Sequence, residues 1–335
     1  MFEPKVILTR RGALACGSAA LLAPAILRGV SAPAEAAASM LGPADPVFRR
    51  FKLGAFEITV VSDCAAMVDG PWPIVGEDRP KEEVEQLMRD SLLPPSRFQP
   101  GFSPIVVNTG AEIVLVDTGN GAEGFVPRPA GGRLVENLRI AGFAPEQIDV
   151  VALTHCHVDH IGGVMEAGKP VFPNARYAVG AIEYDFWKNS DRLKAAEGGN
   201  ELKSAKLFVK TMPPLADRTT FLKAGEEVVP GVTAVAAYGH TPGHLAYHLE
   251  SAGRRLFAWG DCAHHEVASL AHPEWSALFD QDKEQGKATR RRVYDMAATE
   301  RLPVLGYHTS FPSLGFVERS GTGFRWLPVT YQLVE

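Results

Sequence analysis

The sequence predicts an α/β sandwich, because hairpin patterns and helical patterns alternate along the chain instead of forming a simple run of βαβ units. Apolar residues recur with period two in segments 51–63 and 104–119, and glycine interrupts each segment in the manner of a β-hairpin. Residues 79–93 and 132–143 instead have helical spacing, and Gly142 is a typical stop for the second helix. We therefore expect antiparallel strand pairs early in the fold, with helices between and after them.

The rest of the chain continues this alternation. Residues 148–153 form a short apolar run, which predicts a buried strand that ends just before a group of histidines. Further strands are expected at 176–179, 227–237, 245–250, 254–259, 302–307 and 324–329, and helices at 183–189, in parts of 191–212 and at 282–300. No short internal repeat and no Ser/Pro-rich linker divides residues 39–335, so we expect a single domain there.

Residues 1–38 have the three parts of an export signal. Arg10 and Arg11 form a charged region, residues 13–27 are apolar, and "APAEAAA" supplies small-residue cleavage sites near residues 36–38. The adjacent arginines are typical of a twin-arginine signal. An uncleaved membrane anchor is the alternative, but the apolar run is shorter than the roughly 20 residues that span a bilayer. We expect a periplasmic or secreted protein without stable membrane insertion after signal cleavage.

The overall charge argues against a nucleic-acid partner. The 335-residue chain has a formal net charge of −5, and removal of the leader makes the remainder more negative. The single basic run, "RRR" at 290–292, lies in a helical pattern and is interpreted as a solvated helix face. A mildly acidic protein lacks the positive surface that binds phosphate backbones, so we expect no nucleic-acid binding.

The cysteines do not indicate a disulfide framework. Cys16 belongs to the leader, and an odd number remains beyond it, namely Cys64, Cys156 and Cys262. Two of these three adjoin motif residues. We therefore expect buried small side chains beside a site.

Three histidines and a carboxylate lie together in "THCHVDHIGG" at 154–163, where the predicted buried strand ends. His155 and His157 are two positions apart, so in extended backbone they project to one side and can share a metal ion. Asp159 and His160 follow closely enough to ligate a second ion. The segment therefore predicts a metal site at the end of a strand.

Three later segments each supply one candidate ligand after an apolar strand: His240 in "AAYGHTPGH", Asp261 in "LFAWGDC" and His308 in "VLGYHTS". Taken alone, each would more often be a satisfied polar residue at a strand end. The ordered set favours metal binding, and its mixture of imidazoles and carboxylates suits Zn²⁺ or a similar first-row ion. Because a carboxylate can bridge two ions through its two oxygens, Asp261 is the expected bridge.

The ordered elements "HCHVDH", "GHTPGH", an isolated Asp after Gly and an isolated His resemble the metallo-β-lactamase superfamily of metal-dependent hydrolases. The resemblance covers nearly all of the chain after the leader, and "TGAEIVLVDTG" resembles the family's early hairpin with its structural Asp117. It implies an α+β fold, the four-layer αββα sandwich. It also implies two Zn²⁺ or other divalent first-row ions, one on His155, His157 and His240, a second on Asp159, His160 and His308, with Asp261 between them.

The other histidines receive lesser roles. His244, the second His of "GHTPGH", is expected to support the ligands by hydrogen bonding. His264 and His265 are near enough in sequence to reach the site, but surface or supporting roles are favoured for them. His248 and His272 are interpreted as structural.

A glycine pattern at 119–124, "GNGAEG", fits the dinucleotide fingerprint G-x-G-x-x-G. That fingerprint requires a helix to start within it, so that the helix N-terminus faces the pyrophosphate. Here "FVPRPAGG" follows, and its prolines and glycines argue against a helix. We expect a flexible loop at the rim of the metal site and no nucleotide.

The expected chemistry is hydrolysis. Two ions that share a carboxylate can also share a water, and coordination lowers the pKa of that water toward about 7. Hydroxide between the ions would attack a carbonyl carbon or a phosphorus, while one ion stabilises charge on the oxygen. Asp159, which would orient the hydroxide or return its proton, and the bridging Asp261 are the predicted catalytic residues. No G-x-S-x-G element indicates a protein nucleophile.

Substrate class rests on resemblance to exported methyl-parathion-hydrolase-like enzymes and related lactonases, in segments such as "EYDFW" and "VPGVTAVAAYGHTPGH". Aromatic side chains line the pocket of that group, which implies Trp187 and Phe125 as substrate contacts. For Trp187, a core position on an amphipathic helix is an equal alternative. Expected substrates are small hydrophobic lactones, aryl esters or phosphotriesters. Alternatives are β-lactam or thioester hydrolysis and iron-dependent redox chemistry on the same fold, and the sequence leaves open whether the chain is a homodimer.

Overall fold

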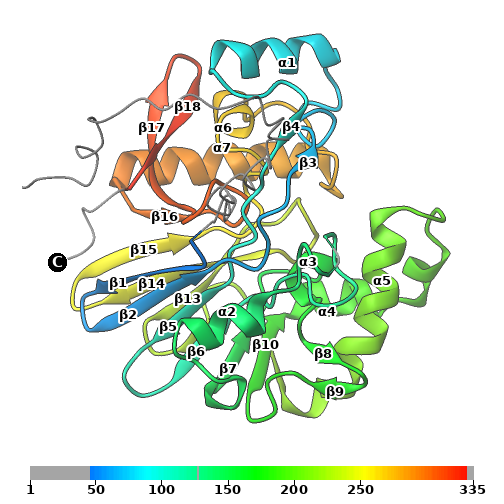
Figure 1. The fold of residues 1–335 in the computed structure, drawn as a ribbon, viewed down its shortest axis with the longest axis vertical. Helices are drawn as coiled ribbons and strands as arrows, with labels where there is room; N and C mark the ends of the chain where they lie inside the picture. Colours follow the sequence, from blue (N-terminus) through cyan, green and yellow to red (C-terminus); the bar gives the residue numbers. More distant parts are fainter. Residues whose placement is uncertain (1–45, 127, 330–335) are drawn as a thin grey trace, which may run out of the picture. The chain divides into compact units, whose positions relative to one another are not determined.

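Two β-sheets of seven strands each form the centre of the computed structural model, which describes residues 46–126 and 128–329 (Figure 1). The strands of the first sheet, in spatial order, are β1 (Phe48–Leu53), β2 (Phe56–Val61), β5 (Ile105–Asn108), β6 (Ile113–Val116), β7 (Val150–Ala152), β10 (Arg176–Gly180) and β11 (Thr219–Leu222). Those of the second are β12 (Glu227–Val229), β13 (Val232–Ala236), β14 (Leu245–Ser251), β15 (Arg254–Ala258), β16 (Val304–Leu305), β17 (Leu314–Ser320) and β18 (Gly323–Pro328).

Both early hairpins predicted from the sequence are present. β1 pairs with β2 in antiparallel register across Gly54, whose φ of +60° favours glycine. β5 and β6 form the second antiparallel pair, and β6, β7, β10 and β11 then continue the sheet in parallel. The sheet is therefore mixed, with hairpins at one edge and crossover connections at the other.

Helices cover the outer face of each sheet. The helices among the described residues are α1 (Lys81–Asp90), α2 (Leu134–Ile140), α3 (Val158–Ile161), α4 (Ala181–Lys188), α5 (Asn200–Thr211), α6 (Ala268–Ala271) and α7 (Lys283–Glu300). In Figure 1, α7 lies on one side of the two sheets and α2, α4 and α5 lie on the other. Short 3₁₀ segments, η1 (Pro145–Gln147), η2 (Ser190–Lys194) and η3 (Pro213–Arg218), link these elements.

The apolar alternation of the strands accounts for the layers. In β6, Val114 and Val116 pack in the core between the sheets, whereas Leu115 packs in the core that includes α2, α4 and α5. In β15, Leu256 belongs to the core between the sheets and Phe257 packs in the core of α7. Because successive side chains of a strand point to opposite faces, each sheet is buried on both sides. The result is the predicted four-layer αββα arrangement.

Several boundaries differ from expectation. The single strand predicted at 227–237 is the hairpin of β12 and β13, which turns at Gly231 with a φ of +84°. β11 was not expected, and β16 contains only two of the residues predicted at 302–307. Two small pairs, β3 (Val68–Asp69) with β4 (Arg97–Phe98) and β8 (Met165–Glu166) with β9 (Lys169–Pro170), complete the structure.

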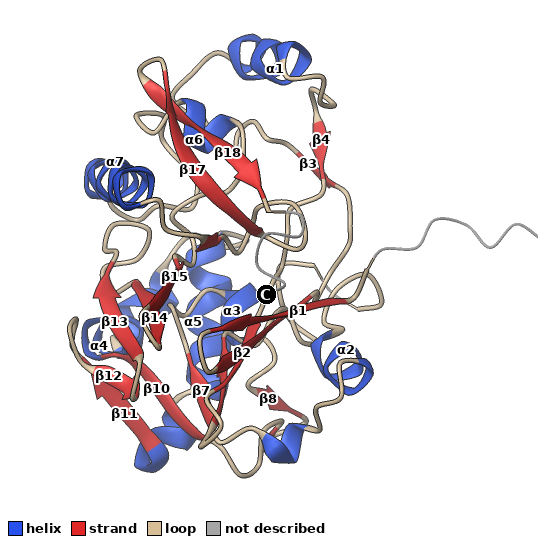
Figure 2. Ribbon diagram, turned by 90° about the vertical axis from the view of Figure 1, so that its left-hand side faces the viewer, coloured by secondary structure: helices blue, strands red, loops and turns tan. Residues whose placement is uncertain are grey.

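A cap lies over one end of the second sheet. Figure 2 shows α1, β3, β4 and α6 gathered there. Val84 and Met88 of α1, Phe98 of β4 and Ala268 of α6 pack together with Trp275 in one buried cluster. The cap brings segments near residues 68–102 towards the ends of the central strands, where the functional site lies.

The export-signal prediction for residues 1–38 lies outside the described residues. Among the residues described, no helix is both long enough and apolar enough to cross a membrane. The described residues, 46–126 and 128–329, belong to one compact unit. The single-domain prediction for 39–335 extends beyond the described ranges and stays a prediction.

Candidate metal centre and active site

The site lies where strands of both sheets end at the same edge. β7 ends at Ala152 immediately before His155, and β15 ends at Ala258 before Asp261. β13 and β16 end before His240 and His308 in the same way. Each of these side chains therefore follows a strand that fixes its position. All seven predicted ligand side chains come together there: His155, His157, Asp159, His160, His240, Asp261 and His308.

His155, His157 and His240 form the first candidate ligand group, with ligand atoms all within 4.8 Å of one another. His240 Nε2 lies 3.1 Å from His155 Nε2 and 2.9 Å from His157 Nδ1. His157 directly precedes helix α3, so the extended backbone before it carries both early histidines to the same side.

Asp159, His160 and His308 form a second group under the same 4.8 Å limit. His308 Nε2 lies 3.5 Å from Asp159 Oδ2. Asp261 lies between the groups, because its Oδ1 is 3.1 Å from His160 Nε2 and its Oδ2 is 3.3 Å from His240 Nε2. We call the seven ligand residues the metal cluster.

Two unsatisfied buried atoms indicate that the metal cluster suits bound cations. His160 Nε2 and Asp261 Oδ1 are buried and, within the described residues, neither makes a hydrogen bond of acceptable geometry despite their proximity. Buried polar atoms without partners are costly and therefore rare. A divalent first-row ion would satisfy both atoms, and imidazole with carboxylate is a donor set that such ions accept.

Burial lowers the pKa of His155, His157 and His240 well below the usual histidine value, so these rings are neutral, the form that ligates metals. Burial acts to raise the pKa of Asp261, but His308 and other nearby histidines outweigh it and hold that pKa well below its usual range. Asp261, between the two ligand groups, therefore carries a charged carboxylate.

Carboxylates behind the site orient two of the histidines. Asp117 Oδ2 accepts a hydrogen bond from His160 Nδ1 at 2.8 Å, and Thr154 donates to both oxygens of Asp117. On the other side, His240 Nδ1 donates to Asp280 Oδ1 at 3.1 Å, and Arg290 binds the second oxygen of Asp280. Such partners set which nitrogen faces the metal and typically tune its affinity. The sequence indicated Asp117 but not Asp280 or Arg290.

Glu183 of α4 is a second feature that the sequence did not indicate. Its side chain is fully buried and accepts hydrogen bonds from Cys156 N, Trp187 Nε1, Thr241 Oγ1 and Gly243 N. Burial raises the pKa of this carboxyl, and the four donors act against that rise. Glu183 thus joins the loop of His155 and His157 to the loop of His240.

His244 holds the bridging segment from behind. Its Nδ1 donates to the Ala237 carbonyl at 2.9 Å, and its Nε2 accepts from the Asp261 backbone N–H at 3.2 Å. This is the kind of supporting position that was expected for it. His248 and His272 lie outside the metal cluster, on β14 and beside Trp275.

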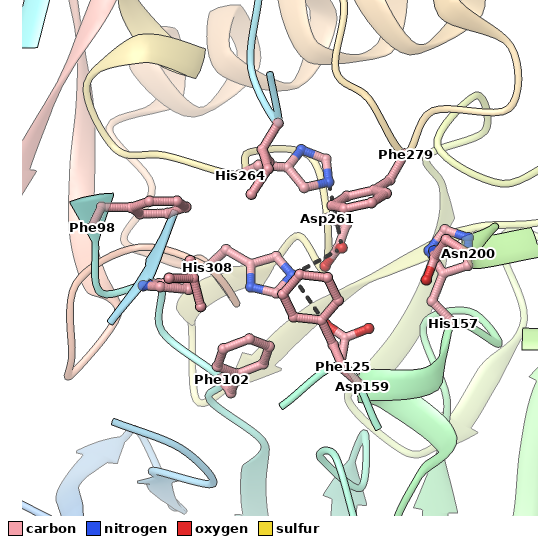
Figure 3. A pocket seen from close by; sticks show the side chains of 13 residues that line it. Phe98, Phe102, Phe125, His157, Asp159, Asn200, Asp261, His264, Phe279 and His308 are labelled. Carbon is pink, nitrogen blue, oxygen red and sulfur yellow. Dashed lines mark hydrogen bonds and ion pairs between the residues drawn. The ribbon is translucent and has the colours of Figure 1, made fainter. Parts of the chain in front are cut away.

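An aromatic cavity opens above the metal cluster (Figure 3). Its lining includes His157, Asp159, Asp261 and His308 together with four phenylalanines. We call these four the aromatic wall: Phe98, Phe102, Phe125 and Phe279. The Phe125 ring lies 5.8 Å from the Phe279 ring and 6.4 Å from the Phe102 ring, so these three rings form a continuous surface. Hydrophobic walls with few polar groups are typical of small-molecule sites.

The two residues predicted to contact substrate differ in position. Phe125 lines the cavity and is 39% exposed. Trp187 is 1% exposed, packs in the core beside α5 and donates its indole N–H to Glu183 at 2.7 Å. It does not line the cavity, and the structure places it in the core, the alternative interpretation of its helical pattern.

The glycine-rich loop at 119–124 is tightly packed, whereas a flexible loop was expected there. Side chains at Gly121 and Gly124 would collide with the backbone of Gly162 and of Asn120. Asp63, buried beneath the loop, accepts hydrogen bonds from Asn120 and from the backbone N–H of Gly132 and Leu134. The glycines thus allow close backbone approach, and they position Phe125 at the cavity.

His264 is a cavity residue that the sequence analysis placed among surface or supporting groups. It is 3% exposed, its Nε2 lies 3.6 Å from Asp261 Oδ2, and its ring lines the cavity. Its neighbour His265 instead accepts backbone N–H bonds from Val267 and Ala268 at the start of α6. Spacing alone could have indicated His264, because it stands three residues after the bridging Asp261 in "GDCAHH".

Three free cysteines, all buried, lie among the described residues: Cys64, Cys156 and Cys262. Burial raises the pKa of Cys262 well above its usual value, and the same holds for Cys156. These side chains behave as small apolar groups beside the site, as the sequence indicated.

The chain is similar to known proteins in its sequence and in its fold. A model of the metallo-beta-lactamase superfamily matches residues 101–300. An N-acyl homoserine lactonase of Bacillus sp. is 30% identical over 155 residues, which are 44% of this chain and 54% of that protein. The chain therefore matches only about half the length of this curated relative.

Two solved structures share the fold across most of the chain. AidC, a dizinc quorum-quenching lactonase solved with a product, is 26% identical, with a TM-score of 0.77 over 85% of this chain and 98% of its own. The hydrolase AbOPH of the beta lactamase superfamily has a TM-score of 0.78 at 24% identity, over 87% and 100% of the two chains, and shows the fold alone. Because the family model spans more than half of the sequence and the metal cluster and four layers agree with it, this chain is a hydrolase that belongs to the metallo-β-lactamase superfamily.

Proposed function

We propose that the chain hydrolyses lactones or related esters with an apolar body, using two divalent ions, zinc in the first instance. One observation carries the proposal: two ligand groups joined by Asp261 lie at the base of an aromatic-lined cavity. Lactonases among the similar proteins support the choice of bond. Aryl esters and phosphotriesters are secondary candidates.

The metal cluster would hold the ions, one on each ligand group with Asp261 between. Ions held in this way lower the pKa of a coordinated water toward about 7 and polarise a carbonyl or phosphoryl oxygen. The contribution of the chain itself is to hold the metal-ligating side chains in position and to keep them buried away from solvent. Asp117, Asp280 and Glu183 do so through hydrogen bonds that need no rearrangement during the reaction.

Asp159 is the side chain placed to handle a proton. It lines the cavity, and burial raises the pKa of its carboxyl, which favours a proton-accepting role at the Oδ2 atom. Tyr307 donates its hydroxyl to the Asp159 carbonyl at 2.7 Å and so fixes the backbone beneath this carboxylate. Asp159 would take the proton at the attack and return it to the leaving oxygen.

The aromatic wall would bind the apolar part of the substrate. Phe125 and Phe279 face the cavity from separate loops, so an acyl chain or aryl ring can pack between them. Contacts of this kind discriminate by shape and apolar area and only weakly by chemistry. We therefore expect activity on several lactones and esters of similar bulk.

The test is a hydrolysis panel on purified, zinc-loaded chain. N-acyl homoserine lactones of several acyl lengths, p-nitrophenyl esters, a phosphotriester, a β-lactam and a thioester serve as substrates. Lactone opening that chelation abolishes and zinc restores is the expected result. A chain that binds two zinc ions yet cleaves only the β-lactam or thioester would refute the proposal. So would iron in natively purified protein together with oxygen consumption.

We also propose export through the paired arginines of the leader. Arg10 and Arg11 precede an apolar run, the order found in twin-arginine signals. Replacing both by lysine should retain the chain in the cytoplasmic fraction, whereas the unchanged chain should appear outside it. Equal fractionation of the two would refute export by this route.

A further inference from the structure

A second, larger cavity adjoins the aromatic cavity, and His157, Asn200 and Phe279 line both. The aromatic cavity has a free volume of only about 30 Å³, which is room for roughly two water molecules. The second cavity, which we call the outer cavity, has about 650 Å³. A third, the cap-side cavity, has about 180 Å³ and adjoins the aromatic cavity at Phe98 and His308. Of these two neighbouring spaces the outer cavity offers more room for the part of a substrate that extends beyond the reacting group.

The outer cavity is lined by charged side chains that already have partners of opposite charge. Arg192 Nη1 lies 2.9 Å from Glu201 Oε1, and the Arg192 guanidinium lies over the ring of Phe186 at 4.8 Å. Asp280, which also lines the cavity, binds Arg290. Because the charges within each pair offset one another, a charged substituent would gain little attraction for the water that it loses. The outer cavity therefore favours an uncharged group.

Asn200 and Arg192 line the outer cavity with hydrogen-bonding groups that no described residue occupies. The partly buried Asn200 amide makes no hydrogen bond within the described residues, and the buried Arg192 Nε has no partner there either. An amide has two N–H donors and a carbonyl acceptor, so Asn200 can bind either kind of polar group. Figure 3 shows Asn200 and His157 across the aromatic cavity from Phe98. Asn200, the first residue of α5, thus lies where the two cavities meet.

We propose that the outer cavity binds an uncharged polar substituent of the substrate, an amide or a hydroxyl, and that Asn200 recognises this substituent by a hydrogen bond. The proposal rests on the proposed function and narrows its substrate class to lactones or esters that carry such a group near the scissile bond. The hydrogen bond holds the substituent at the junction of the two cavities while the reacting group lies over the metal cluster. A substrate held at two points is better oriented for attack than one held at a single point.

Three α-substituted γ-butyrolactones of equal chain length test this recognition: one with an acylamino group, one with a hydroxyalkyl group and one with an alkyl group that has no polar atom. Asn200→Leu keeps the size of the side chain but removes its hydrogen-bonding atoms, and Asn200→Ser keeps a hydroxyl. Gln99→Leu is the matched control, because it removes an amide from the lining of the cap-side cavity. For each protein we would measure zinc content, kcat and KM on each lactone, and affinity for the ring-opened products.

We expect Asn200→Leu to lower kcat/KM about 3- to 10-fold on the acylamino or the hydroxyalkyl lactone and to leave the alkyl lactone unchanged. Affinity for the matching product should fall in parallel, Asn200→Ser should recover part of the loss, and Gln99→Leu should show none of it. An equal loss on all three lactones, no loss on any, or a selective loss in Gln99→Leu instead would overturn the proposal. So would a lower zinc content in Asn200→Leu, because the residue would then act through the metal cluster. Absence of lactone hydrolysis by the unsubstituted chain would instead refute the proposed function.

Discussion

The metal cluster and the aromatic wall face the same cavity but are built in different ways. Side chains of the metal cluster follow strand ends, and hydrogen bonds to Asp117, Asp280 and Glu183 hold the loops behind them. The aromatic wall comes from the cap and from loops, and ring packing holds it together. From this difference we expect the cluster to be held in place for chemistry and the wall to be the part that selects the substrate.

The largest effect is expected from the bridge. Asp261→Ala removes the carboxylate that lies between the two ligand groups and, with it, the negative charge that would offset two divalent ions. We expect hydrolysis to fall below detection and zinc content to fall below two ions per chain, measured by elemental analysis. Asp185→Ala, an exposed residue of α4, is the matched control and should retain both. Full activity in Asp261→Ala would contradict the assignment of the cluster.

A smaller effect is expected behind the cluster. Asp280→Asn keeps the shape of the side chain but weakens its hold on His240 Nδ1 and leaves Arg290 without its charge partner. Zinc affinity should fall about 10- to 100-fold, as is typical for partners of metal-bound histidines. Competition with a chromogenic chelator measures the change. Asp282→Asn, at the N-terminus of α7, serves as control, and equal affinities in the two variants would remove the role given to Asp280.

In the aromatic wall, Phe125→Ala should change selectivity more than turnover. The side chain is partly exposed and contacts Phe102 and Phe279. Its loss removes apolar contact with the substrate but removes no side chain of the metal cluster. We expect KM for long-chain acyl lactones to rise about 10-fold, with kcat and zinc content nearly unchanged. Equal effects on short and long acyl chains would show that Phe125 does not contact the acyl group.

The smallest effect on catalysis is expected at His265, which supports the cap. Burial lowers the pKa of His265 to about 4, and its Nδ1 accepts two backbone N–H bonds. The unfolded residue titrates near pH 6.5, so the folded state gains stability above that pH and loses it as pH falls towards 4. The loss between pH 7.5 and pH 5 should be roughly 2 kcal/mol. Urea unfolding of His265→Gln should lack this part of the pH dependence, and an identical slope would contradict it.

Much of the fold and of the metal cluster was predictable because the relevant signals are local. The alternation in 51–63 and 104–119 predicted hairpins, since a strand's side chains alternate faces whatever the rest of the chain does. "HCHVDH" carries four of the seven ligand residues within six positions, so their spacing alone places them together. The remaining three each follow an apolar strand, and strand ends meet at one edge of a sheet.

Other features depended on contacts between distant segments. Asp280 meets His240 across 40 positions, and Glu183 meets Thr241 across 58, so no spacing in the sequence indicated either pair. Trp187 fitted both a pocket wall and a core, and only the packing of α4 against its neighbours decided for the core. The glycines of 119–124 were compatible with a flexible loop until the backbone of Gly162 was placed against them.

The sequence by itself thus determined the strand pattern, the ligand types and their order, because these follow from side-chain chemistry and short-range backbone geometry. The tertiary structure alone decided which carboxylates orient the ligands, which aromatic rings reach the cavity and that His264 lines it. Burial and hydrogen bonding are set by which surfaces pack together, and that is a property of the whole fold.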